Sequence, residues 1–442
     1  MKKINLSGKR VTIMGLGLQG QGLWAAKVAS RQKAKVTVTD LRTAKDLAPS
    51  LKKLEGLPIR YVLGRHQERD FIESDLVVRN PSVPNDSKFL KIARAAKVPI
   101  EMEIGLFFLL APIQRKNLIG VTGTRGKTTT TVLISRILAE AGLKSVVGGN
   151  IPQKPALSLL SKVEPKTTVV LELSSWQLEG LAHHRISPHI GVITNVYRDH
   201  LNRYQSMADY ITAKKLIFAF QKPGDFLVLN QENKQSKQLA QSARSRVRYF
   251  SSSQLQPSLA AAVKLKGKHN LANAAAAAVV AKLKGIDQRI IKKAFQGFQG
   301  LPSRLEFVRK VEGVSFYNDT CSTIPEATMA ALETFKQPII LIAGGADKKL
   351  HFGQLGQRIK NSSVRSIVLL GGDATDKLEK VLDKKIIQGQ FNDLKKAVLK
   401  AKSLARPGEI VLLSPACTSF SMFKNEFERG DKFRKIVKSF KG

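Results

Sequence analysis

The sequence predicts an α/β protein with three domains, each built around a mostly parallel sheet. Three groups of short apolar strands recur along the 442 residues, and most of these strands end in a glycine or a polar turn. Stretches of helical character separate the strands, as βαβ units require. We expect a Rossmann-like domain over residues 1–98, a central domain of the P-loop type over 99–300, and a second Rossmann-like domain over 301–442.

The first group of strands carries a glycine-rich turn. Its expected strands are Arg10–Gly15, Lys35–Asp40 and Asp75–Arg79. Gly15, Gly17 and Gly20 follow the first strand, and Asp40 ends the next one. Glycines let a backbone approach a phosphate, and a carboxylate at that place can bind a hydroxyl or an imide. The pattern is compatible with NAD, with a UDP group, or with a plain turn that packs a helix on the sheet.

The second group of strands leads into a long helix and a hinge. Its expected strands are Leu118–Thr122, Thr167–Glu172 and Ile190–Asn195. The alanine-rich run Asn273–Ala281 predicts a buried helix, and Gly285 gives it a stop. Gly297–Pro302 predicts a hinge, after which the third group begins.

The strongest local motif is Gly123-Thr-Arg-Gly126-Lys127-Thr128, between an expected strand and a helical stretch. Glycines expose backbone N–H groups to a phosphate, and the N-terminus of the following helix favours negative charge. Lys127 is predicted to reach the outer phosphates of a nucleotide, and the Thr128 hydroxyl to ligate Mg²⁺. The usual spacing G-x-x-x-x-G-K-[ST] is not met, because Val121 holds its first glycine position. The alternative is an ordinary glycine turn with an exposed Lys127.

Polar side chains follow the other strands of the second group. Glu172 ends a strand, where a carboxylate facing a phosphate loop can hold a metal or water. Taken alone, it is better explained as a solvated strand end. His200 is either a metal ligand or a structural histidine, and Lys214 by itself predicts a solvated lysine. Asn273 fits a helix cap as well as a contact to adenine.

The third group of strands is expected at Pro338–Gly344, Ser366–Gly371 and Glu409–Ser414, again a doubly wound pattern. Arg304 lies just past the hinge and can swing onto a triphosphate, and Asp319 can orient a ribose or a metal. A surface ion pair is the alternative for both. The hydroxyl-rich run that ends at Ser419 precedes a possible helix start. It suits either carboxylate binding or a plain N-cap.

Composition limits the protein classes. Lysine and arginine exceed aspartate and glutamate by 73 − 34 = 39, and they are scattered along the whole chain. Such a charge steers anionic substrates, but no basic tail or aromatic platform predicts a specific nucleic-acid partner. Two distant cysteines, Cys321 and Cys417, do not make a disulfide framework, which fits a reducing cytoplasm. No apolar run reaches the roughly 18 residues of a membrane span.

Taken in chain order, these motifs resemble the Mur ligase family over nearly the whole sequence. They are G-T-x-G-K-T, E-L-S-S-x-Q-L, N-x-x-x-D-H, H-N-x-x-N-A, G-L-P-x-R-x-E, N-D-T and S-P-A-C-x-S. The second motif and L-L-S-P-A-C-x-S resemble the branch that adds D-glutamate. The resemblance implies a cytoplasmic, monomeric ligase that uses ATP and Mg²⁺. It would join D-glutamate to UDP-N-acetylmuramoyl-L-alanine through an acyl phosphate, in peptidoglycan synthesis.

The resemblance also implies a role for individual residues. ATP contacts would come from Gly123, Thr124, Gly126, Lys127, Thr128, Thr129, Asn273, Arg304 and Asp319. The metal ligands would be Thr128, Glu172, His200 and Lys214, the last as a carbamate. The UDP substrate would contact Gly15, Leu18, Gln19, Asp40, Asn80, Asn150 and Gln177. The amino acid would contact Lys348, Ser419 and Phe427, and catalysis would depend on Lys127, His200 and Lys214.

The sequence departs from the family pattern at two places. Cys321 stands where many members have a lysine, and Glu426 stands at the aligned aromatic position, one residue before Phe427. Another Mur-family amino-acid ligase is therefore the first alternative, although the complete first domain argues against a polyglutamate-adding type. A nicotinamide oxidoreductase and a basic nucleic-acid-binding protein are the others, and the second phosphate loop has no role in either.

Overall fold

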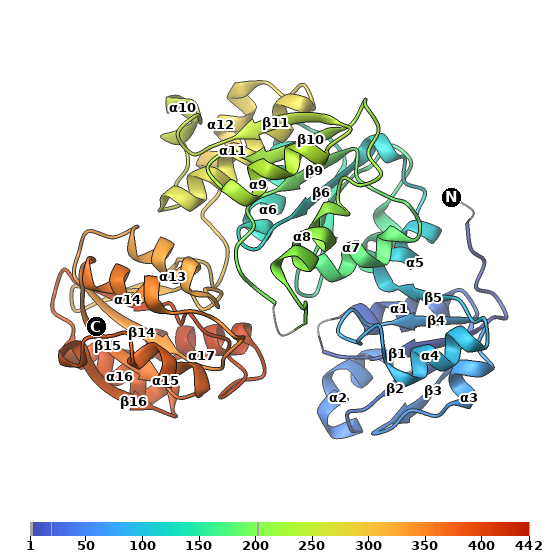
Figure 1. Ribbon diagram of the computed structural model, residues 1–442, viewed down its shortest axis with the longest axis horizontal. Coiled ribbons are helices and arrows are strands. Elements are labelled where there is room, and N and C mark those ends of the chain that lie inside the picture. Colours follow the sequence, from blue (N-terminus) through green and yellow to red (C-terminus); the bar gives the residue numbers. More distant parts are fainter. Residues whose placement is uncertain (1–2, 19, 201–202, 442) are drawn as a thin grey trace.

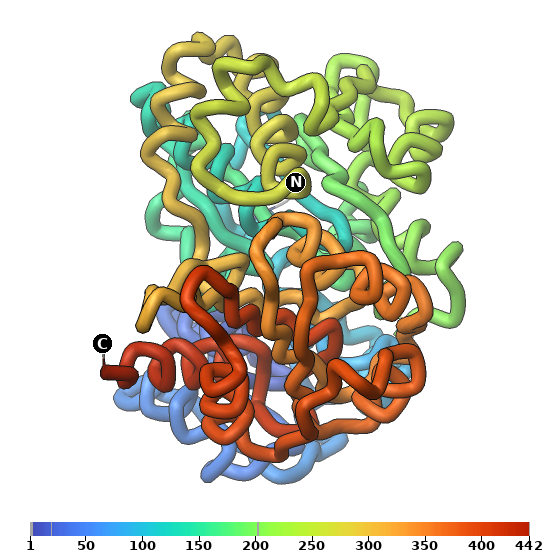
Figure 2. The backbone as a smooth tube through the Cα atoms, turned by 90° about the vertical axis from the view of Figure 1, so that its left-hand side faces the viewer, coloured from blue at the N-terminus to red at the C-terminus, as the bar shows by residue number. Residues whose placement is uncertain are grey.

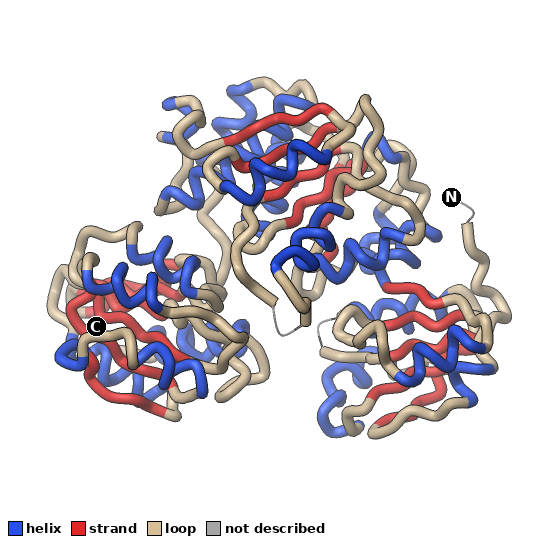
Figure 3. Tube along the Cα trace, viewed as in Figure 1, coloured by secondary structure: helices blue, strands red, loops and turns tan. Residues whose placement is uncertain are grey.

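The computed structural model of the protein describes residues 3–18, 20–200 and 203–441. It has three lobes, each built on its own sheet, and the middle lobe joins the N-terminal and C-terminal ones (Figure 1). The view turned by a right angle shows the C-terminal lobe in front of the N-terminal lobe, both below the middle one (Figure 2). Helices flank the strands in each lobe (Figure 3). The predicted three-domain α/β fold is thus confirmed.

The N-terminal sheet has the order β3-β2-β1-β4-β5, and all its strand pairs are parallel. Its strands are β1 (Arg10–Met14), β2 (Lys35–Asp40), β3 (Ile59–Leu63), β4 (Leu76–Arg79) and β5 (Ile100–Met102). Its helices are α1 (Gln21–Arg31), α2 (Ala44–Leu51), η1 (Lys52–Leu54), α3 (Arg69–Ile72) and α4 (Lys88–Ala95). The sequence did not predict β3 and β5, because β5 is only three residues long and β3 leaves most of its side chains partly exposed.

The middle sheet has the order β11-β10-β9-β6-β8-β7 and is also parallel throughout. Its strands are β6 (Leu118–Thr122), β7 (Ser145–Gly149), β8 (Thr168–Glu172), β9 (Ile190–Ile193), β10 (Phe226–Asn230) and β11 (Arg246–Phe250). The longer helices are α5 (Glu103–Leu110), α6 (Lys127–Glu140), α7 (Ser175–Ala182), α8 (Met207–Lys215), α11 (Lys268–Leu283) and α12 (Gln288–Gln296). The short ones are η2 (Arg115–Asn117), η3 (Ala156–Lys162), α9 (Lys234–Gln238), η4 (Leu239–Ser242) and α10 (Pro257–Ala260).

The C-terminal sheet has the order β12-β13-β17-β14-β15-β16, with one antiparallel pair at its edge. Its strands are β12 (Glu306–Val311), β13 (Val314–Asn318), β14 (Ile339–Gly344), β15 (Val364–Leu370), β16 (Ile387–Phe391) and β17 (Ile410–Leu413). Its helices are α13 (Pro325–Leu332), α14 (Gly353–Lys360), α15 (Asp373–Glu379), η5 (Lys384–Ile386), α16 (Leu394–Leu404) and α17 (Glu426–Lys438). The hairpin β12–β13 was not predicted; its two-residue turn places Glu312 and Gly313 at φ of 49° and 79°, as a type I′ turn requires.

The hydrophobic cores show how the lobes are joined. One core is shared between the N-terminal and middle lobes and includes Val11 and Leu106 together with Leu178 and Leu227. The two cores of the C-terminal lobe contain only residues from that lobe. The first two lobes therefore pack as one body, while the third has cores of its own. None of the helices in the described part of the chain combines the length and hydrophobicity needed to cross a bilayer.

Candidate functional site

The phosphate-type loop lies where the sequence predicts it, at the end of β6, and α6 begins at Lys127. Gly126 is the N-cap of α6 with φ of 81°, and Gly123 has φ of 145°. Side chains rarely adopt such φ values. A Cβ at Gly126 would also collide with Asn273, and one at Gly123 with Thr194. Glycine at both positions lets the loop pass close to the neighbouring strand and helix.

The residues that follow β9 hold this loop in place. The Thr194 hydroxyl donates to the carbonyl of Arg125 at 2.6 Å. The Asn195 side chain accepts from the backbone N–H of Arg125 at 2.8 Å and donates to its carbonyl at 3.1 Å. Thr124 N–H donates to the carbonyl of Asn195 at 2.9 Å. Because β6 and β9 are parallel neighbours, the sheet register fixes the shape of the loop.

Two lysines lie beside the loop, Lys127 partly buried and Lys214 fully buried. Lys127 Nζ donates to the carbonyl of Thr124 at 3.1 Å. Lys214, on α8, is only 1% exposed, and its Nζ lies 4.5 Å from the centre of the Tyr210 ring. Burial lowers the pKa of Lys127, and burial together with the charge of Lys127 lowers the pKa of Lys214 well below its ordinary value. The prediction of a solvated Lys214 is therefore wrong.

Glu172, at the end of β8, is also buried, so the expectation of a solvated strand end is wrong. Its Oε1 accepts from Asn150 Nδ2 at 3.0 Å, whereas its buried Oε2 has no hydrogen-bond partner. An unpaired buried carboxylate oxygen is costly, which favours a cation as its partner. Glu172 and Thr128 line the same cleft, and carboxylate and hydroxyl oxygens are ligands that Mg²⁺ prefers. The residues of this site fit Mg²⁺.

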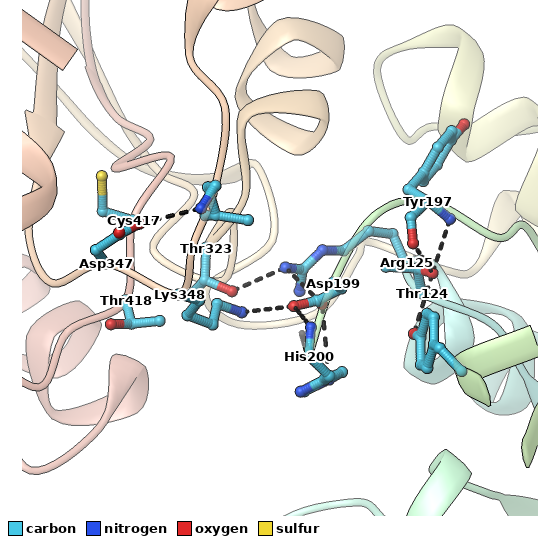
Figure 4. Close-up of polar contacts among 12 residues, drawn as sticks. Thr124, Arg125, Tyr197, Asp199, His200, Thr323, Asp347, Lys348, Cys417 and Thr418 are labelled. Carbon is cyan, nitrogen blue, oxygen red and sulfur yellow. Dashed lines mark hydrogen bonds and ion pairs between the residues drawn. The ribbon is translucent and has the colours of Figure 1, made fainter. Parts of the chain in front are cut away.

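Asp199 connects the middle domain to the C-terminal domain (Figure 4). Lys348 Nζ, from the loop after β14, donates to Asp199 Oδ1 at 2.9 Å, and Arg125 lies 3.6 Å from Oδ2. Arg125 also donates to the Thr323 hydroxyl at 2.8 Å. Burial opposes ionisation of Asp199, but Lys348, His200 and Arg125 outweigh it and hold the pKa of Asp199 well below its ordinary range. The contact between these two domains is therefore charged.

His200 lies next to Asp199 among aromatic side chains. Its Nε2 is 3.6 Å from Asp199 Oδ2, and its ring centre is 5.5 Å from Trp176 and 5.9 Å from Tyr210. Burial lowers the pKa of His200 to about 3, so the imidazole is neutral near pH 7. A neutral imidazole has the lone pair that a metal ligand needs.

Arg304 reaches the phosphate loop from the C-terminal domain, where its Nη2 donates to the Thr128 hydroxyl at 2.8 Å. Asp319, directly after β13, is buried and accepts from Leu305 N–H at 3.0 Å and from Ser414 Oγ at 2.9 Å. Burial raises the pKa of Asp319 to about 6. Asp319 thus anchors the segment that carries Arg304. A surface ion pair, the alternative for both residues, is excluded.

Two adjoining clefts surround the loop. All three domains line the first, with Gln21 from the N-terminal domain, Lys127 and Glu172 from the middle domain, and Arg304 and Phe427 from the C-terminal domain. The second extends over α11 and α13 and includes Thr129, Tyr197, Asn233, Asn273 and Asp319 in its lining. Arg125, Gly126, Arg304 and Cys321 line both. The arrangement can hold several ligands around one phosphate loop.

The glycine-rich turn of the N-terminal domain follows β1. Gly15 has φ of 89°, and a Cβ there would lie 2.9 Å from the Cβ of Asn80. Asp40 accepts hydrogen bonds from the backbone N–H groups of Gly17 at 3.1 Å and Arg42 at 3.0 Å. The Asp40 carboxylate already stabilises the turn. A ligand that binds this carboxylate therefore adds to the two hydrogen bonds that it accepts from the backbone.

The other predicted contacts to the UDP substrate are dispersed. Asn150 lines the first cleft. Gln177 caps α7 by accepting from Ser174 N–H at 3.1 Å, and its buried Nε2 has no hydrogen-bond partner. Leu18 is 38% exposed. Gln19 lies outside the described residues.

The predicted amino-acid contacts are not all brought together. Within the described chain, Phe427 lines the first cleft beside Cys321 and Glu426, whereas Lys348 and Ser419 belong to neither lining. The amine of Lys348 is engaged by Asp199, as described above. Ser419 Oγ is buried and has no hydrogen-bond partner.

The predicted helix cap in the alanine-rich segment is also wrong. The asparagines of the alanine-rich helix were expected as possible caps, but α11 begins at Lys268 with Gly267 as its N-cap. Asn273 therefore lies inside the helix, where its Oδ1 accepts from the Thr130 hydroxyl at 3.4 Å and its Nδ2 donates to Asn270 at 3.2 Å. Lys268 and His269 belong to the first turn of α11, so the helix begins before the alanine-rich run.

Sequence reasoning gave no role to several residues that hold the site together. Arg125, Asn195 and Asp199 lie inside the quoted motifs, but spacing alone does not reveal that they bind the loop or the C-terminal domain. Arg429, on α17, is 1% exposed and donates to the Thr320 hydroxyl at 2.9 Å. No sequence pattern separates such a buried arginine from the many exposed ones in a chain this basic.

Comparison with known proteins identifies matches along the chain. Residues 9–102 match the N-terminal domain of the MurD-like Mur ligases, 121–261 the Mur ligase middle domain, and 303–417 the glutamate ligase domain of Mur ligases. A UDP-N-acetylmuramoylalanine–D-glutamate ligase of Roseiflexus sp. (strain RS-1) is 45% identical, covering 99% of this chain and 100% of the relative. One from Geotalea daltonii is 37% identical, covering 99% of each chain.

Solved structures share the fold. The UDP-N-acetylmuramate-alanine ligase MurC of Thermotoga maritima superposes with a TM-score of 0.63 at 20% identity, covering 98% of this chain and 100% of that one. The ligase MurF of the same organism, in complex with ADP, gives a TM-score of 0.61 at 16% identity, covering 91% and 95%. At these identities the likeness concerns the fold.

Proposed function

This chain belongs to the Mur ligase family, and we propose that it joins D-glutamate to UDP-N-acetylmuramoyl-L-alanine with hydrolysis of ATP, in peptidoglycan synthesis. Full-length similarity to ligases of that name supports the substrates. The observation that carries the chemistry is the first cleft, where Lys127, Thr128 and Glu172 face Arg304 from the C-terminal domain. Cations, a hydroxyl and an unpaired carboxylate converge there around a loop shaped for phosphate.

The proposed reaction follows from charge. A carboxylate is a poor electrophile, so its oxygen first attacks the γ-phosphorus of ATP, and the β–γ bridging oxygen leaves with ADP. The amine of D-glutamate then attacks the acyl carbon, gives up a proton, and the phosphate leaves with the electron pair of the C–O bond. Orientation of three substrates in one cleft can supply roughly 7–11 kcal/mol of the barrier reduction.

In this proposal the residues of the middle and C-terminal domains divide the work. The N–H groups of Gly123, Thr124 and Gly126 and the amine of Lys127 bind the phosphates, and Arg304 binds the transferred phosphoryl group. Thr128, Glu172 and His200 would hold Mg²⁺, which would neutralise phosphate charge when bound. Thr129, Asn273 and Asp319 line the second cleft, which suits the nucleoside part of ATP.

Lys214 is proposed to act as a carbamate. Its buried amine has a lowered pKa, and a neutral amine has the lone pair needed to attack the carbon of CO₂. The product is an N-carboxylate and a released proton, which replaces a cation by an anion beside the metal ligands. An uncarbamylated, protonated Lys214 would repel the metal.

The N-terminal domain is proposed to bind the UDP substrate, through Gly15, Leu18, Gln19, Asp40 and Asn80, with Asn150 and Gln177 extending the contact. Lys348, Ser419 and Phe427 are proposed to hold D-glutamate. Because β5 pairs with β4, we place the first domain boundary after residue 102, and the second near residue 302. We further propose that the protein is a cytoplasmic monomer.

The decisive experiment is a phosphate-release assay with UDP-N-acetylmuramoyl-L-alanine, D-glutamate and Mg-ATP, with each component omitted in turn. Release that requires all components is expected. Lys127→Ala should lower kcat at least ~10³-fold, because it removes a cation from the phosphates. Lys144→Ala, which changes an exposed lysine of the same domain, is the matched control. Equal rates in the two variants would refute the assignment of the phosphate loop.

A substrate panel tests the amino-acid choice. Cys321 and Glu426 line the first cleft at the two places where the sequence departs from the family pattern. D-glutamate is expected to be the preferred amino acid over L-alanine and L-lysine. Activity with one of the others and none with D-glutamate would identify a different amino-acid ligase of the same family.

A further inference from the structure

A cluster of two histidines and a carboxylate lies outside the site described above. Glu101 is the middle residue of β5, and His183 and His184 directly follow α7. Glu101 Oε1 lies 3.1 Å from His183 Nε2, and Oε2 lies 2.9 Å from His184 Nε2. These ligand atoms all lie within 4.8 Å of one another. The three residues belong to neither cleft lining, and none of them is among the residues assigned to the ligase site.

The surrounding chain holds the cluster in a close-packed setting. The Glu101 side chain is 9% exposed, and a Cβ at Gly105 would lie 2.5 Å from its Oε2. A Cβ at Gly180 would lie 2.6 Å from Met102 Sδ, so α7 approaches β5 closely. Two glycines therefore make room for the carboxylate and for the helix that brings the histidines.

The charge environment of Glu101 is unusual for this protein. The chain has 73 lysines and arginines against 34 aspartates and glutamates. Yet the ion pairs of the described residues give Glu101 no lysine or arginine partner, only the two imidazoles. Glu101 thus pairs only with two imidazoles although the chain is very basic. This arrangement fits a metal cation that binds both carboxylate and imidazole.

The donor set matches a particular class of cation. Two imidazole nitrogens and a carboxylate oxygen are ligands of Zn²⁺ and neighbouring first-row metals, whereas Mg²⁺ prefers oxygen. Tetrahedral bonds of about 2.0–2.2 Å place ligand atoms about 3.3–3.6 Å apart, so the two nitrogen–oxygen contacts of 3.1 and 2.9 Å need to lengthen by only a few tenths of an ångström to admit the metal. His183 is 51% exposed, which leaves the remaining coordination position open to water.

We propose that Glu101, His183 and His184 form a binding site for a divalent first-row transition metal, of which zinc is the best match. The metal would bridge β5, the edge strand of the N-terminal sheet, to the end of α7 in the middle domain. Zinc at this site would stabilise the junction of these two domains and would leave the ligase chemistry to the clefts. The proposal does not depend on the function assigned to those clefts.

The test is zinc binding by the full-length, tag-free protein, stripped of metal and held in excess Mg²⁺ so that oxygen-rich sites are filled. Equilibrium dialysis counts zinc per chain, and Co²⁺ in place of zinc gives a visible absorption spectrum that reports tetrahedral nitrogen and oxygen ligands. The wild type is expected to bind one zinc more than the His183→Ala/His184→Ala variant. Each single substitution should weaken that binding by roughly 100-fold or more.

His189→Ala is the matched control, because His189 also pairs with a buried carboxylate, Asp225 at 2.7 Å, but has no second histidine. It should retain the zinc and the cobalt spectrum. Glu101→Gln preserves the shape of the side chain and should lose zinc while keeping its fold by circular dichroism. Equal zinc content in the wild type and the double variant, or no zinc bound at micromolar free zinc, would overturn the proposal.

Discussion

The junction between the N-terminal and middle domains rests mainly on a shared apolar core, with the Glu101–His183–His184 cluster at one place, whereas the junction between the middle and C-terminal domains is polar. Across the first, α1 of the N-terminal domain packs against α5 and η3 of the middle domain within one shared core. Across the second, Arg304 bonds to Thr128, Arg125 to Thr323, and Lys348 to Asp199. The strength of an apolar contact does not depend on the charge of a bound ligand. The strength of a contact made by cations and hydroxyls does.

The difference indicates which domain is free to move. Separating the first two domains would expose core side chains, so this junction has a stability close to that of the fold itself. Opening the second junction exchanges hydrogen bonds and ion pairs for contacts with water, and this exchange leaves a typical hydrogen bond a net contribution of only about 0.5–1.5 kcal/mol. We therefore expect the C-terminal domain to close on anionic substrates while the other two domains act as one body.

The largest effect is expected when a buried side chain is removed from the apolar junction. Phe107, on α5, is fully buried in the shared core, and Phe107→Ala should lower the free energy of unfolding by about 3–5 kcal/mol. The N-terminal and middle domains should then melt together in one calorimetric transition. Phe316→Ala, at a fully buried position of the C-terminal core, is the control and should shift only the transition of that domain. Separate melting of the first two domains would contradict the comparison.

A smaller effect, on catalysis instead of stability, is expected at the polar junction. Arg304→Ala removes the guanidinium that reaches the phosphate loop and should lower kcat/KM for ATP about 10²-fold. Arg304→Lys should recover part of the loss, because lysine restores the positive charge but lacks the planar guanidinium group. Steady-state kinetics measures both, and the melting temperature should stay within a degree or two. A fall in stability as large as that of Phe107→Ala would show that the second junction also carries the fold.

The apolar junction also predicts a pH dependence. Glu103, the first residue of α5, is buried, and its Oε1 accepts from Leu157 N–H while its Oε2 has no hydrogen-bond partner. Burial raises the pKa of Glu103 to about 8. Between about pH 4.5 and 8 the unfolded chain releases this proton and the folded chain keeps it. The stability that Glu103 gives is therefore full below this window and is lost as pH rises, by up to about 1.4 kcal/mol per pH unit.

Glu103→Gln isolates this effect, because the amide keeps the acceptor for Leu157 but cannot ionise. Urea unfolding of both proteins is measured at several pH values. From pH 6 to 8, the free energy of unfolding of the variant should rise relative to that of the wild type by about 1 kcal/mol or more. A constant difference across that range would mean that Glu103 is charged in the folded protein.

The smallest effect is expected on the exposed surface. Arg358 pairs with Glu333 at 2.8 Å, but both side chains are nearly half exposed. Arg358→Ala should change the free energy of unfolding by less than about 0.5 kcal/mol and leave kcat unchanged. Arg358→Ala therefore serves as the reference for Arg304→Ala, and both variants are measured in the same kinetic and unfolding assays.

The accuracy of the sequence predictions followed the local information in the chain. β6 and the loop from Gly123 to Gly126 were predicted to the residue, because an apolar run, glycines and a helix start adjoin one another. The short strand β5 and the hairpin β12–β13 were not, because their pairing depends on partners elsewhere in the chain. Lys214 was predicted as solvated because its burial depends on the phosphate loop with Lys127, which is far from it in sequence, and not only on Tyr210 one turn earlier on α8.

The sequence by itself determined the three strand groups, the phosphate loop and the order of motifs that places the chain in its family, since each is written in neighbouring residues. The tertiary structure decided which charges are buried, which residues of distant segments meet, and which junction is rigid. Burial and through-space distance set pKa values and pairings such as Asp199 with Lys348. These quantities depend on how segments far apart in the chain pack, so no local pattern contains them.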